Sequence, residues 1–410
     1  MANHIFLELL QAAEGKRRCL SKVLTEEEWI QVYGLFKKHA LLGIGYVAIQ
    51  KLPREQWPPK AMILQWVAIA QQIRQRNLEL SEECNEVVTI LKHDGIESVV
   101  IKGQSNMENY PEELRDFRSS GDIDLWTKLT NDSGIPIAVQ QGESVEYEYY
   151  KGMRGIIEYA RLQCRLREDK SPFKPLYYHV EYHTGKGTEV EMHYRPSFLC
   201  SPIRNMRMQR WFKEQFDVCL KNKCQLGFPV LTSSVNVIYQ LLHLYRHVFE
   251  GGVGLRQLMD YYFALRVWHN DAMECKDLQS QGMWSEGLGT PVMSKEEVMA
   301  VLRSFGMKKF ASAVMYVLHE VFAIPTNYYI CEPNGKEGRK LLEEIMKGGN
   351  FGQYDERGKE FKNGGMIKHG LWKLKRVMRL VRSYPEEALW EPVFRVWHLL
   401  WRRIKEGLKN

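Results

Sequence analysis

A change in hydrophobic period along the chain constrains its fold more than any other feature. Residues 1–94 and the residues after Pro196 place apolar side chains at helical spacing, whereas residues 95–196 contain short runs rich in β-branched residues. Because the strand-rich section is short, it can form only a small sheet. We therefore predict an α+β fold, in which a small mixed β-sheet core is embedded between an N-terminal helical section and a large C-terminal helical section.

The strand-rich section divides into separate elements. Two short runs, the β-branched 97–102 and 122–126, have the composition of strands. The runs 176–184 and 188–194 are joined by a glycine-containing loop and predict an antiparallel hairpin. Before this hairpin, residues 152–167 have the period of a helix.

The sections on either side are predicted to be helical. The longest helical pattern before the sheet runs from Ala61 to Leu91. Later helices are expected at about 204–221, 233–249, 254–269, 294–305, 308–321, 335–347, 366–382 and 386–406. Residues 270–291 and 349–365 are rich in Gly, Ser, Asn and charge, which predicts loose connections. The domain boundaries that follow are 1–94, 95–196, 197–350 and 351–410.

The positive charge of the chain is concentrated near its end. The 410 residues carry a net charge of +7, but residues 357–410 hold 14 Lys and Arg against 5 Asp and Glu. The residues before this segment therefore sum to about −2. A body without a basic excess makes DNA, or another long nucleic acid, an unexpected partner.

The cysteines give no sign of a disulfide framework or a zinc ribbon. All eight occur singly, without a Cys-x-x-Cys pair, so reduced cysteines are expected. The first ten residues have no basic segment before their apolar residues, and no run of about 18 uninterrupted apolar residues occurs. These features predict a cytoplasmic protein.

The motif Gly121-Asp122-Ile123-Asp124-Leu125 carries the strongest chemical signal. Two aspartates two residues apart in a strand project from the same face, because side chains alternate along a strand. Neighbouring carboxylates repel each other unless a cation lies between them, and Mg²⁺ prefers such oxygen ligands. An isolated Asp-x-Asp is weak evidence, so the argument needs other segments.

Two segments supply that support. Upstream, an apolar run ends in Lys102-Gly103-Gln104-Ser105, an order of strand, glycine and helix start that turns backbone N–H groups towards phosphate. Downstream, Glu191 in the predicted hairpin supplies a third carboxylate. Three carboxylates on neighbouring strands and a glycine turn can together hold two metal ions and a triphosphate.

On these residues the chain resembles the bacterial uncharacterised nucleotidyltransferase family, within the DNA polymerase β-type nucleotidyltransferase superfamily. The resemblance covers residues from about 95 to 265. The segments that match the family's motifs are Lys102-Gly103, Arg118 to Leu125 with its Arg-x-x-Gly-Asp-Ile-Asp-Leu pattern, Glu191-Met192-His193-Tyr194, the histidines His243 and His247, Leu255-Arg256 and Asp260.

The resemblance implies transfer of a nucleotidyl group from an NTP to a hydroxyl group, with Mg²⁺, or Mn²⁺ in its place, as the cofactor and pyrophosphate as the leaving group. It implies that Asp122, Asp124 and Glu191 are the catalytic and metal-binding residues. The nucleotide-binding residues expected beside them are Lys102, Gly103, Gln104, Ser105, Arg118, Gly121 and Arg195. The chain departs from the superfamily at Gln104, where Gly or Ser is usual, and in its long interval of 18 residues between Gly103 and Asp122.

Neighbouring residues in the hairpin allow alternative interpretations. Glu189 lies on the same strand face as Glu191 and is an alternative third carboxylate. His193 also shares the face of Glu191, where it either approaches substrate or makes a structural hydrogen bond. His179 and His183 do not have the His-Glu-x-x-His spacing of a zinc hydrolase.

The helical part after the hairpin contains three features with structural interpretations. His243 and His247 lie on one helix face, where hydrogen bonding in the core is the favoured interpretation. Asp260 and Arg256 are i, i+4 neighbours and are able to pair. The glycine-rich segment 251–254 follows a helix and predicts a helix-ending turn in preference to a phosphate loop.

The last two predicted helices are amphipathic. The first has an apolar stripe opposite its Lys and Arg residues, and the second, at 386–406, is rich in Trp. The stripe consists of Ile367, Leu371, Leu374, Met378 and Val381. These helices either pack on the protein with a solvated basic face, or contact a membrane surface or an acidic partner through residues 366–406.

The expected partners are therefore an NTP substrate and a hydroxyl acceptor, which is a small molecule, a sugar or a protein. Two other classes of function stay as alternatives: a non-catalytic nucleotide-binding scaffold that keeps the fold, and nucleotidyl transfer directed to RNA. The three carboxylates argue for catalysis. The basic tail supports RNA, but the sequence contains no recognisable RNA-binding motif.

Overall fold

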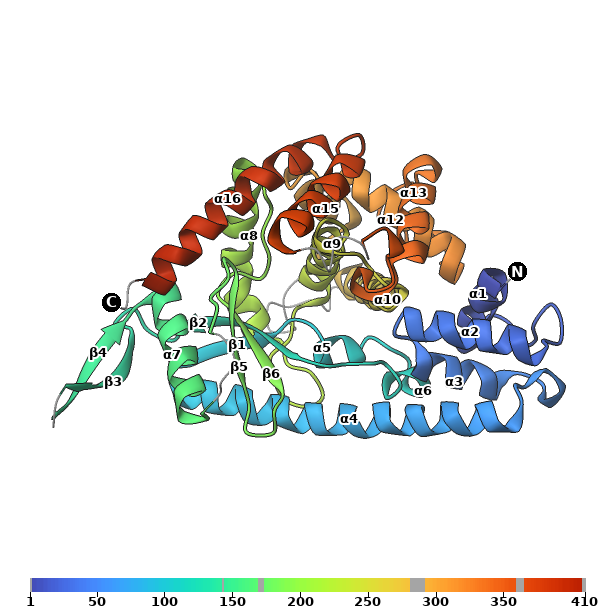
Figure 1. Ribbon diagram of the computed structural model, residues 1–410, viewed down its shortest axis with the longest axis horizontal. Coiled ribbons are helices and arrows are strands. Elements are labelled where there is room, and N and C mark those ends of the chain that lie inside the picture. The colour runs from blue at the N-terminus through green and yellow to red at the C-terminus, as the bar shows by residue number, and fades with distance from the viewer. Residues whose placement is uncertain (1, 142–143, 169–172, 281–291, 359–364, 408–410) are drawn as a thin grey trace. The chain divides into compact units, whose positions relative to one another are not determined.

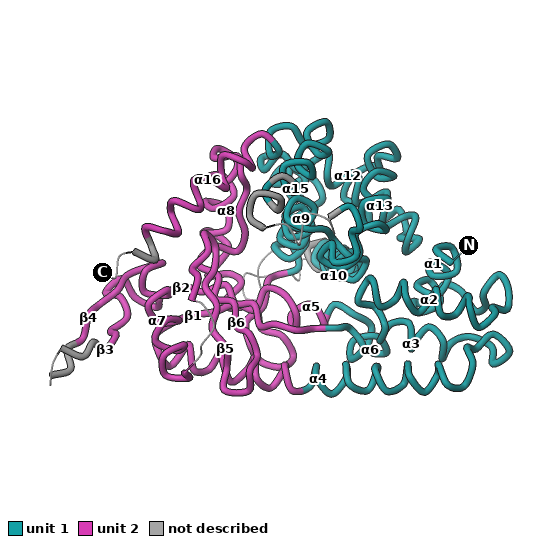
Figure 2. Tube along the Cα trace, viewed as in Figure 1, with its two compact units in different colours: residues 1–78, 109–119, 233–388 teal, residues 79–108, 120–232, 389–410 magenta. Residues whose placement is uncertain are grey.

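The computed structural model confirms an α+β fold, with a small mixed sheet in a chain that is mostly helical (Figure 1). It describes residues 2–141, 144–168, 173–280, 292–358 and 365–407. The chain divides into two units (Figure 2). Unit 1 comprises residues 1–78, 109–119 and 233–388, and unit 2 comprises residues 79–108, 120–232 and 389–410. Each unit is thus assembled from separated segments, which cut across the four sections predicted from the sequence.

Unit 1 is helical in its described residues. Its helices are α1 (Ala2–Ala13), α2 (Glu26–Lys38), α3 (Leu42–Lys51), the first part of α4 (Lys60–His93), α6 (Glu112–Arg115), α9 (Ser233–Glu250), α10 (Leu255–Ser280), α11 (Lys295–Ser304), α12 (Lys308–Phe322), α13 (Gly335–Gly348), α15 (Gly365–Leu380) and the start of α16 (Pro385–Gly407). Short 3₁₀ turns occur at Arg54–Gln56, Thr326–Tyr328, Asn350–Gly352 and Glu356–Gly358. The predicted N-terminal helices are confirmed, and α2 begins at a capping box formed by Thr25 and Glu28.

The end of α10 was predicted wrongly. The helix continues to Ser280 instead of ending near residue 269, so residues 270–280 are helical and not a loose connection. Its last eleven residues contain neither Gly nor Pro, so nothing in this segment terminates the helix. The rest of that predicted connection, residues 281–291, lies outside the described residues, as does 359–364 in the second predicted connection.

Unit 2 contains the strands. Its elements are the last part of α4, β1 (Ile96–Val100), α5 (Gln104–Met107), β2 (Ile123–Leu129), β3 (Ile135–Gln141), β4 (Ser144–Tyr150), α7 (Gly152–Leu166), β5 (His179–His183), β6 (Glu189–His193), α8 (Pro202–Lys221) and most of α16. The predicted strands, the helix α7 and the hairpin of β5 and β6 are confirmed. The separate two-stranded sheet of β3 and β4 was not predicted.

The four-stranded sheet of unit 2 has the order β1-β2-β6-β5. Strand β2 is antiparallel to β1 and parallel to β6, while β6 is antiparallel to β5. Asp124 on β2 therefore lies opposite Glu191 on β6, and Glu191 lies opposite Glu181 on β5. Two residues further along and on the same face, Trp126 lies opposite His193, which lies opposite His179. Residues far apart in the sequence are thus aligned in two rows across the sheet.

One face of this sheet forms the core of unit 2. Ile123 and Leu125 on β2 and Val190 and Met192 on β6 are buried with apolar side chains from the end of α4 and from α7. Because side chains alternate along a strand, Asp124 and Glu191 project from the opposite face. The packing of the core therefore fixes which side chains form the polar face.

The part of α16 in unit 2 packs on aromatic residues before β5. The ring of Tyr177 makes edge contacts with Phe394, Trp397 and Trp401, and its backbone N–H donates to Nε2 of His398 at 3.1 Å. Other apolar side chains of the helix are exposed, namely Leu389, Val393, Val396, Leu400 and Ile404. The helix therefore has one packed aromatic face and one exposed apolar face.

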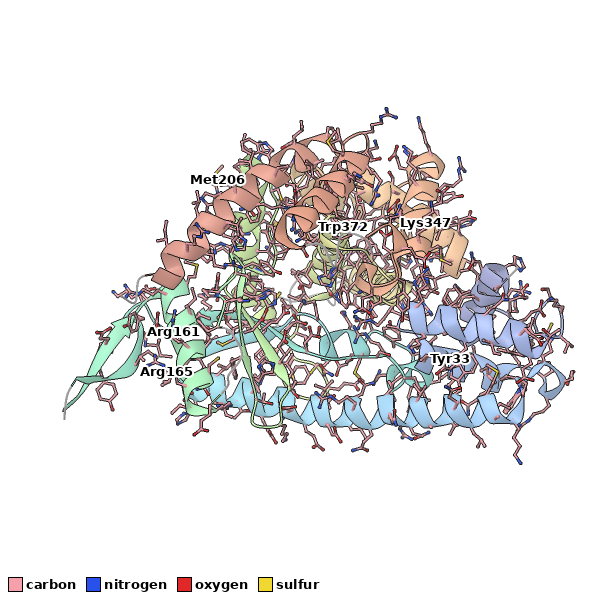
Figure 3. The ribbon with its side chains drawn as sticks, viewed as in Figure 1. Tyr33, Arg161, Arg165, Met206, Lys347 and Trp372 are labelled. Atoms are coloured by element: carbon pink, nitrogen blue, oxygen red, sulfur yellow. The ribbon has the colours of Figure 1, made fainter. Side chains whose placement is uncertain are left out.

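The predicted apolar stripe of α15 is wrong. Trp372 (labelled in Figure 3) and Val377 are buried, whereas Leu374 and Met378 are 48% and 61% exposed. Buried Arg376 accounts for this orientation, because its guanidinium donates to the carbonyl of Val248 through Nε and Nη2. The side chains of residues 367 and 371 lie outside the described part. In the described part of the chain, no helix is both long and apolar enough to cross a membrane.

Candidate functional site

The turn after β1 brings Lys102 to the first residues of β2. Gly103 has φ +59° and ψ −111°, a conformation that favours glycine, and a Cβ there would lie 3.2 Å from the carbonyl oxygen of Asp122. The N–H of Ile101 donates to the carbonyl of Asp124 at 3.0 Å. The hydrogen bonds of the turn itself begin with the N–H of Ser105, which donates to the carbonyl of Lys102.

Three carboxylates lie together on the polar face of the sheet. Ligand oxygens of Asp122, Asp124 and Glu191 are all within 4.8 Å of one another. Asp124 is buried, while Asp122 and Glu191 are half-buried. The two aspartates come from the start of β2, and Glu191 comes from its parallel neighbour β6. Glu189 belongs to a different acidic group, with Glu181 and Glu191.

Cationic and polar groups already balance these carboxylates. Nζ of Lys102 lies 2.5 Å from Oδ1 of Asp124 and 3.6 Å from Oε2 of Glu191. Nε2 of His193 lies 2.8 Å from Oε2 of Glu191 and 3.3 Å from Oδ1 of Asp124. Of the two interpretations of His193, the structure thus shows the hydrogen-bonding one, with a carboxylate of β2 and a carboxylate of β6 as partners. The ammonium of Lys102 lies close to the same two carboxylates.

The charges of this group shift its pKa values in opposite directions. Burial, reinforced by the charges of Asp122 and Glu191, raises the pKa of Asp124 to about 7 against the lowering effect of Lys102. Burial acts in the same direction on Glu191, but Lys102, His179 and His193 outweigh it and hold the pKa of Glu191 well below its usual range. Hydrogen bonds to Asp124 and Glu191 raise the pKa of His193 although burial lowers it. In the absence of a bound cation, Asp124 therefore takes up a proton before Glu191 does.

The other residues predicted in unit 2 lie around this group in different ways. Ser105 is largely buried and its hydroxyl donates to the carbonyl of Lys102 at 3.3 Å. Gln104 is 2% exposed. Gly121 is exposed and has open space around it. Nη1 of Arg195 donates to the carbonyl of Tyr177, and its guanidinium lies over the Tyr177 ring at 4.3 Å.

Arg118 belongs to unit 1 and has a carboxylate partner there. Its Nε and Nη2 donate to the two carboxylate oxygens of Asp260 at 2.7 and 2.8 Å, and both side chains are buried. Tyr110 donates to the same carboxylate at 2.7 Å. Such a bidentate pair holds the segment of Arg118 against α10. A contact of Arg118 with nucleotide stays a prediction.

The remaining motifs of unit 1 have local partners. Nε2 of His243 and Nε2 of His247 lie 2.9 Å apart on α9, and Arg256 donates to the carbonyl of Ser119 at 2.7 Å. The predicted helix-ending turn is confirmed, because the N–H groups of residues 251 and 252 donate to the carbonyl of His247. These contacts join histidine, arginine and backbone groups, and none of them involves a carboxylate.

Sequence reasoning missed the role of His179. Its Nε2 lies 2.7 Å from Oε1 of Glu181, and its Nδ1 lies 3.6 Å from Oε2 of Glu191. The signal was present in the predicted hairpin, because the pairing of β5 with β6 sets His179 directly opposite His193. Counting the pairs back from the loop would have brought both histidines beside Glu191.

A known protein family matches much of the chain. The family model described as uncharacterised nucleotidyltransferase matches residues 25–282, which is more than half of the chain. The chain belongs to this nucleotidyltransferase family. No curated protein and no solved structure matches it. The matched residues include every strand of the four-stranded sheet, so the resemblance inferred from the motifs is confirmed.

The donor set on the sheet fits a divalent cation. Asp122, Asp124 and Glu191 offer hard carboxylate oxygens from two neighbouring strands, at separations that one or two ions can span. Burial, and after it the charges of Asp122 and Glu191, raises the pKa of Asp124, and a cation bound there would stabilise the ionised carboxylate. A cation bound there would take over the charge balance that Lys102 supplies in the structure.

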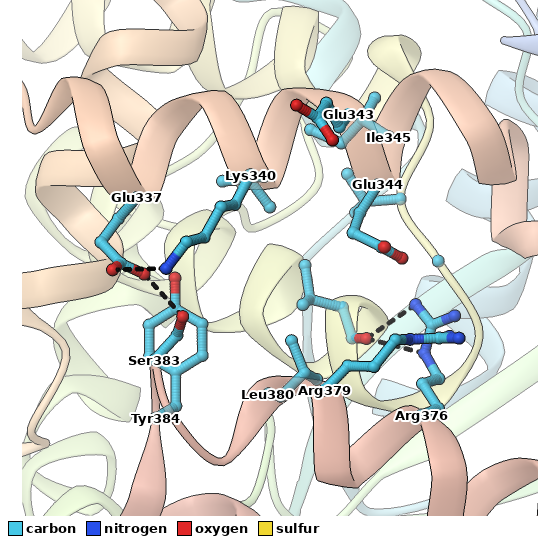
Figure 4. Close-up of a pocket in the computed structure, with 14 residues that line it drawn as sticks. Glu337, Lys340, Glu343, Glu344, Ile345, Arg376, Arg379, Leu380, Ser383 and Tyr384 are labelled. Atoms are coloured by element: carbon cyan, nitrogen blue, oxygen red, sulfur yellow. Dashed lines mark hydrogen bonds and ion pairs between the residues drawn. The ribbon is translucent and has the colours of Figure 1, made fainter.

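A separate pocket lies within unit 1 (Figure 4). Helices α13 and α15 line it with residues of both charges, and their contacts fix its walls. Ser383 donates to Oε2 of Glu337, Lys340 donates to Oε1 of Glu337 at 3.1 Å, and Arg376 donates to Val248. The charged groups that line this pocket are thus largely used in holding the helices together.

Proposed function

We propose that the chain transfers a nucleotidyl group from an NTP to a hydroxyl group of an acceptor. The observation that supports this most strongly is the group of Asp122, Asp124 and Glu191 on one sheet face, in a chain of a nucleotidyltransferase family. The glycine turn at Gly103 lies directly before this face, since Gly103 approaches the carbonyl of Asp122. Carboxylates and a glycine turn are the parts that nucleotidyl transfer requires.

In this proposal the three carboxylates hold a divalent cation, Mg²⁺ or Mn²⁺, which would neutralise charge on the triphosphate. Glu191, kept ionised by its neighbours, accepts the proton of the attacking hydroxyl. The ammonium of Lys102, which pairs with Asp124 in the structure, would be released by the bound cation and would pair with the phosphates. The turn at Gly103 and Gln104 positions the phosphates through backbone N–H groups.

The double variant Asp122→Asn, Asp124→Asn tests the proposal. It is expected to lose Mg²⁺-dependent NTP binding and transfer while it still unfolds in a cooperative transition, because amides keep the shape of the side chains but not their charge. Asp217→Asn is the matched control, since Asp217 is an exposed aspartate of the same unit that pairs with Lys128. Transfer by the double variant at the wild-type rate would show that these aspartates do not carry the reaction.

The third carboxylate is tested separately. Glu191→Gln is expected to abolish transfer, whereas Glu189→Gln, a change on the same strand face, is expected to leave it intact. The reverse result would assign the role to Glu189. Each α-labelled NTP is incubated with the protein, Mg²⁺ or Mn²⁺ and a cell extract, and the fraction that takes up label identifies the acceptor as protein, RNA or small molecule.

A non-catalytic nucleotide-binding protein is the second candidate. The position of Lys102 favours it, because this ammonium already neutralises Asp124 and Glu191, as a bound metal ion would. Under this alternative, NTP binds without any transfer of label, and binding survives removal of divalent ions with EDTA.

A further inference from the structure

Two histidines stand beside the carboxylates on the polar face of the sheet. His179 on β5 and His193 on β6 are directly paired, and their rings lie 4.9 Å apart between centroids. Both side chains are buried, at 3% and 1% exposure. Ligand atoms of His179, Glu191 and His193 all lie within 4.8 Å of one another. The carboxylates Glu181 and Glu191 are therefore followed, two residues further along on the same face of the sheet, by the imidazoles of His179 and His193.

The ring of His179 is oriented towards this group. Its Nε2 lies 2.7 Å from Oε1 of Glu181, a half-exposed carboxylate that is free to accept the ring proton. Its Nδ1 is buried, has no hydrogen-bond partner, and lies 3.6 Å from Oε2 of Glu191. A buried nitrogen without a partner is costly unless something binds it. A carboxylate that fixes the far ring nitrogen is also the common arrangement around a histidine that binds a metal.

His193 completes the set of ligands from the other side of Glu191. Its Nε2 is 2.8 Å from Oε2 of Glu191. Ligand atoms bound about 2.1 Å from one ion lie roughly 3 to 3.5 Å apart, which is close to the two separations from Glu191. Binding of an ion replaces the proton that lies between His193 Nε2 and Glu191, and that proton leaves to solvent.

We propose that His179, Glu191 and His193 form a second cation site, which binds a divalent first-row transition-metal ion through two imidazole nitrogens and one carboxylate. Imidazole nitrogen suits Fe²⁺, Ni²⁺, Cu²⁺ and Zn²⁺, whereas Mg²⁺ and Mn²⁺ are bound mainly through oxygen, so imidazole coordination of any of these ions would mark this site. The site shares Glu191 with the group of Asp122 and Asp124. This second site deepens the proposed function. Its role in the reaction rests on that proposed function, whereas binding of the ion does not.

Mn²⁺ bound to the full-length wild-type protein provides the direct test. Pulsed electron paramagnetic resonance of the complex is expected to show coupling to imidazole ¹⁴N, without any nucleotide present. Mn²⁺ that binds without ¹⁴N coupling, or no Mn²⁺ binding, would overturn the proposal. Because this measurement needs no variant, it does not depend on how well a buried substitution folds.

Two variants locate the nitrogen ligands. His179→Gln is expected to weaken Mn²⁺ binding about tenfold or more and to reduce the ¹⁴N coupling. His183→Gln, on the same strand but outside the group of three, is the matched control and is expected to keep both. Equal losses in the two variants would refute the assignment of His179.

The outcomes separate this proposal from the proposed function. Nitrogen coupling without nucleotidyl transfer would leave the ion site standing and overturn only the reaction. Efficient transfer with Mg²⁺, together with Mn²⁺ bound by oxygen alone, would overturn only the histidine site.

Discussion

Lys102 offers the sharpest test of how the carboxylate group is balanced. The substitution Lys102→Met keeps the length of the side chain but removes its charge. In the structure, the ammonium lies 2.5 Å from Asp124 and 3.6 Å from Glu191, with side-chain exposures of 16%, 2% and 14% for the three residues. Water therefore screens these charges poorly, and the variant leaves carboxylates without their nearest cation.

The expected loss is large for one side chain. Removing one partner of a buried ion pair costs about 3 to 5 kcal/mol. For a unit of 150 to 250 residues, a change of that size lowers the melting temperature by on the order of 10 °C. Lys102 also lowers the pKa of Asp124, so in the variant this pKa rises further and Asp124 is protonated near neutral pH. The loss is therefore expected to grow as the pH is raised above about 7.

Thermal unfolding in EDTA, followed at several pH values, measures this loss. Lys128→Met is the matched control, because Lys128 pairs with Asp217 at 2.7 Å in the same unit but both side chains are more than half exposed. That exposed pair is expected to contribute at most about 1 kcal/mol. Addition of Mg²⁺ or Mn²⁺ is expected to reduce the loss in Lys102→Met. Equal melting of the two variants in EDTA, or a loss unchanged by divalent ions, would refute the reasoning.

Two further predictions concern buried charges. Arg118→Met leaves Asp260 without its bidentate partner and is expected to cost about 3 to 5 kcal/mol of unfolding free energy, measured with urea; wild-type stability with weaker NTP binding would instead assign Arg118 to the nucleotide. In metal-free protein, the pKa of Asp124 is raised from 3.8 to about 7, so the folded state binds more protons than the unfolded state between these values. Its contribution to the unfolding free energy therefore falls as the pH rises from about 4 to 7, and Asp124→Asn is expected to remove that part of the slope. Parallel pH profiles for wild type and variant would contradict this assignment.

The fold was predictable where local pattern and tertiary structure agree. The strands β1 and β2 are β-branched or apolar runs, and the glycines between β5 and β6 mark their hairpin. Strand β4 also alternates, as Ser-Val-Glu-Tyr-Glu-Tyr-Tyr, but its Glu and Tyr residues do not make an apolar face, and Pro136 weakens the pattern of β3. These two strands form a separate two-stranded sheet. They were not predicted because strands are recognised in a sequence by runs with an apolar face.

Part of the candidate site was predictable. The spacing of Asp122 and Asp124 indicated that both project from one strand face, but alternation left Glu189 and Glu191 open, and only the resemblance to the family motif favoured Glu191, which the structure brings together with the two aspartates. The parallel pairing of β2 with β6 was not readable from the sequence, since it joins segments that are not consecutive strands. The pair of Arg118 with Asp260, separated by 142 residues, had no local signal, whereas Arg256 and Asp260 suggested a helical pair.

The division of the chain into interleaved segments has a consequence for its synthesis. The strands of the four-stranded sheet are complete once residue 193 has been made, but the aromatic face of α16 that packs on Tyr177 belongs to residues 394–401. About two hundred residues must therefore leave the ribosome before the loop preceding β5 acquires these contacts. Until then, an apolar surface at Tyr177 and Phe198 stays uncovered by α16 on the nascent chain, which makes this loop a place where a chaperone would engage the protein.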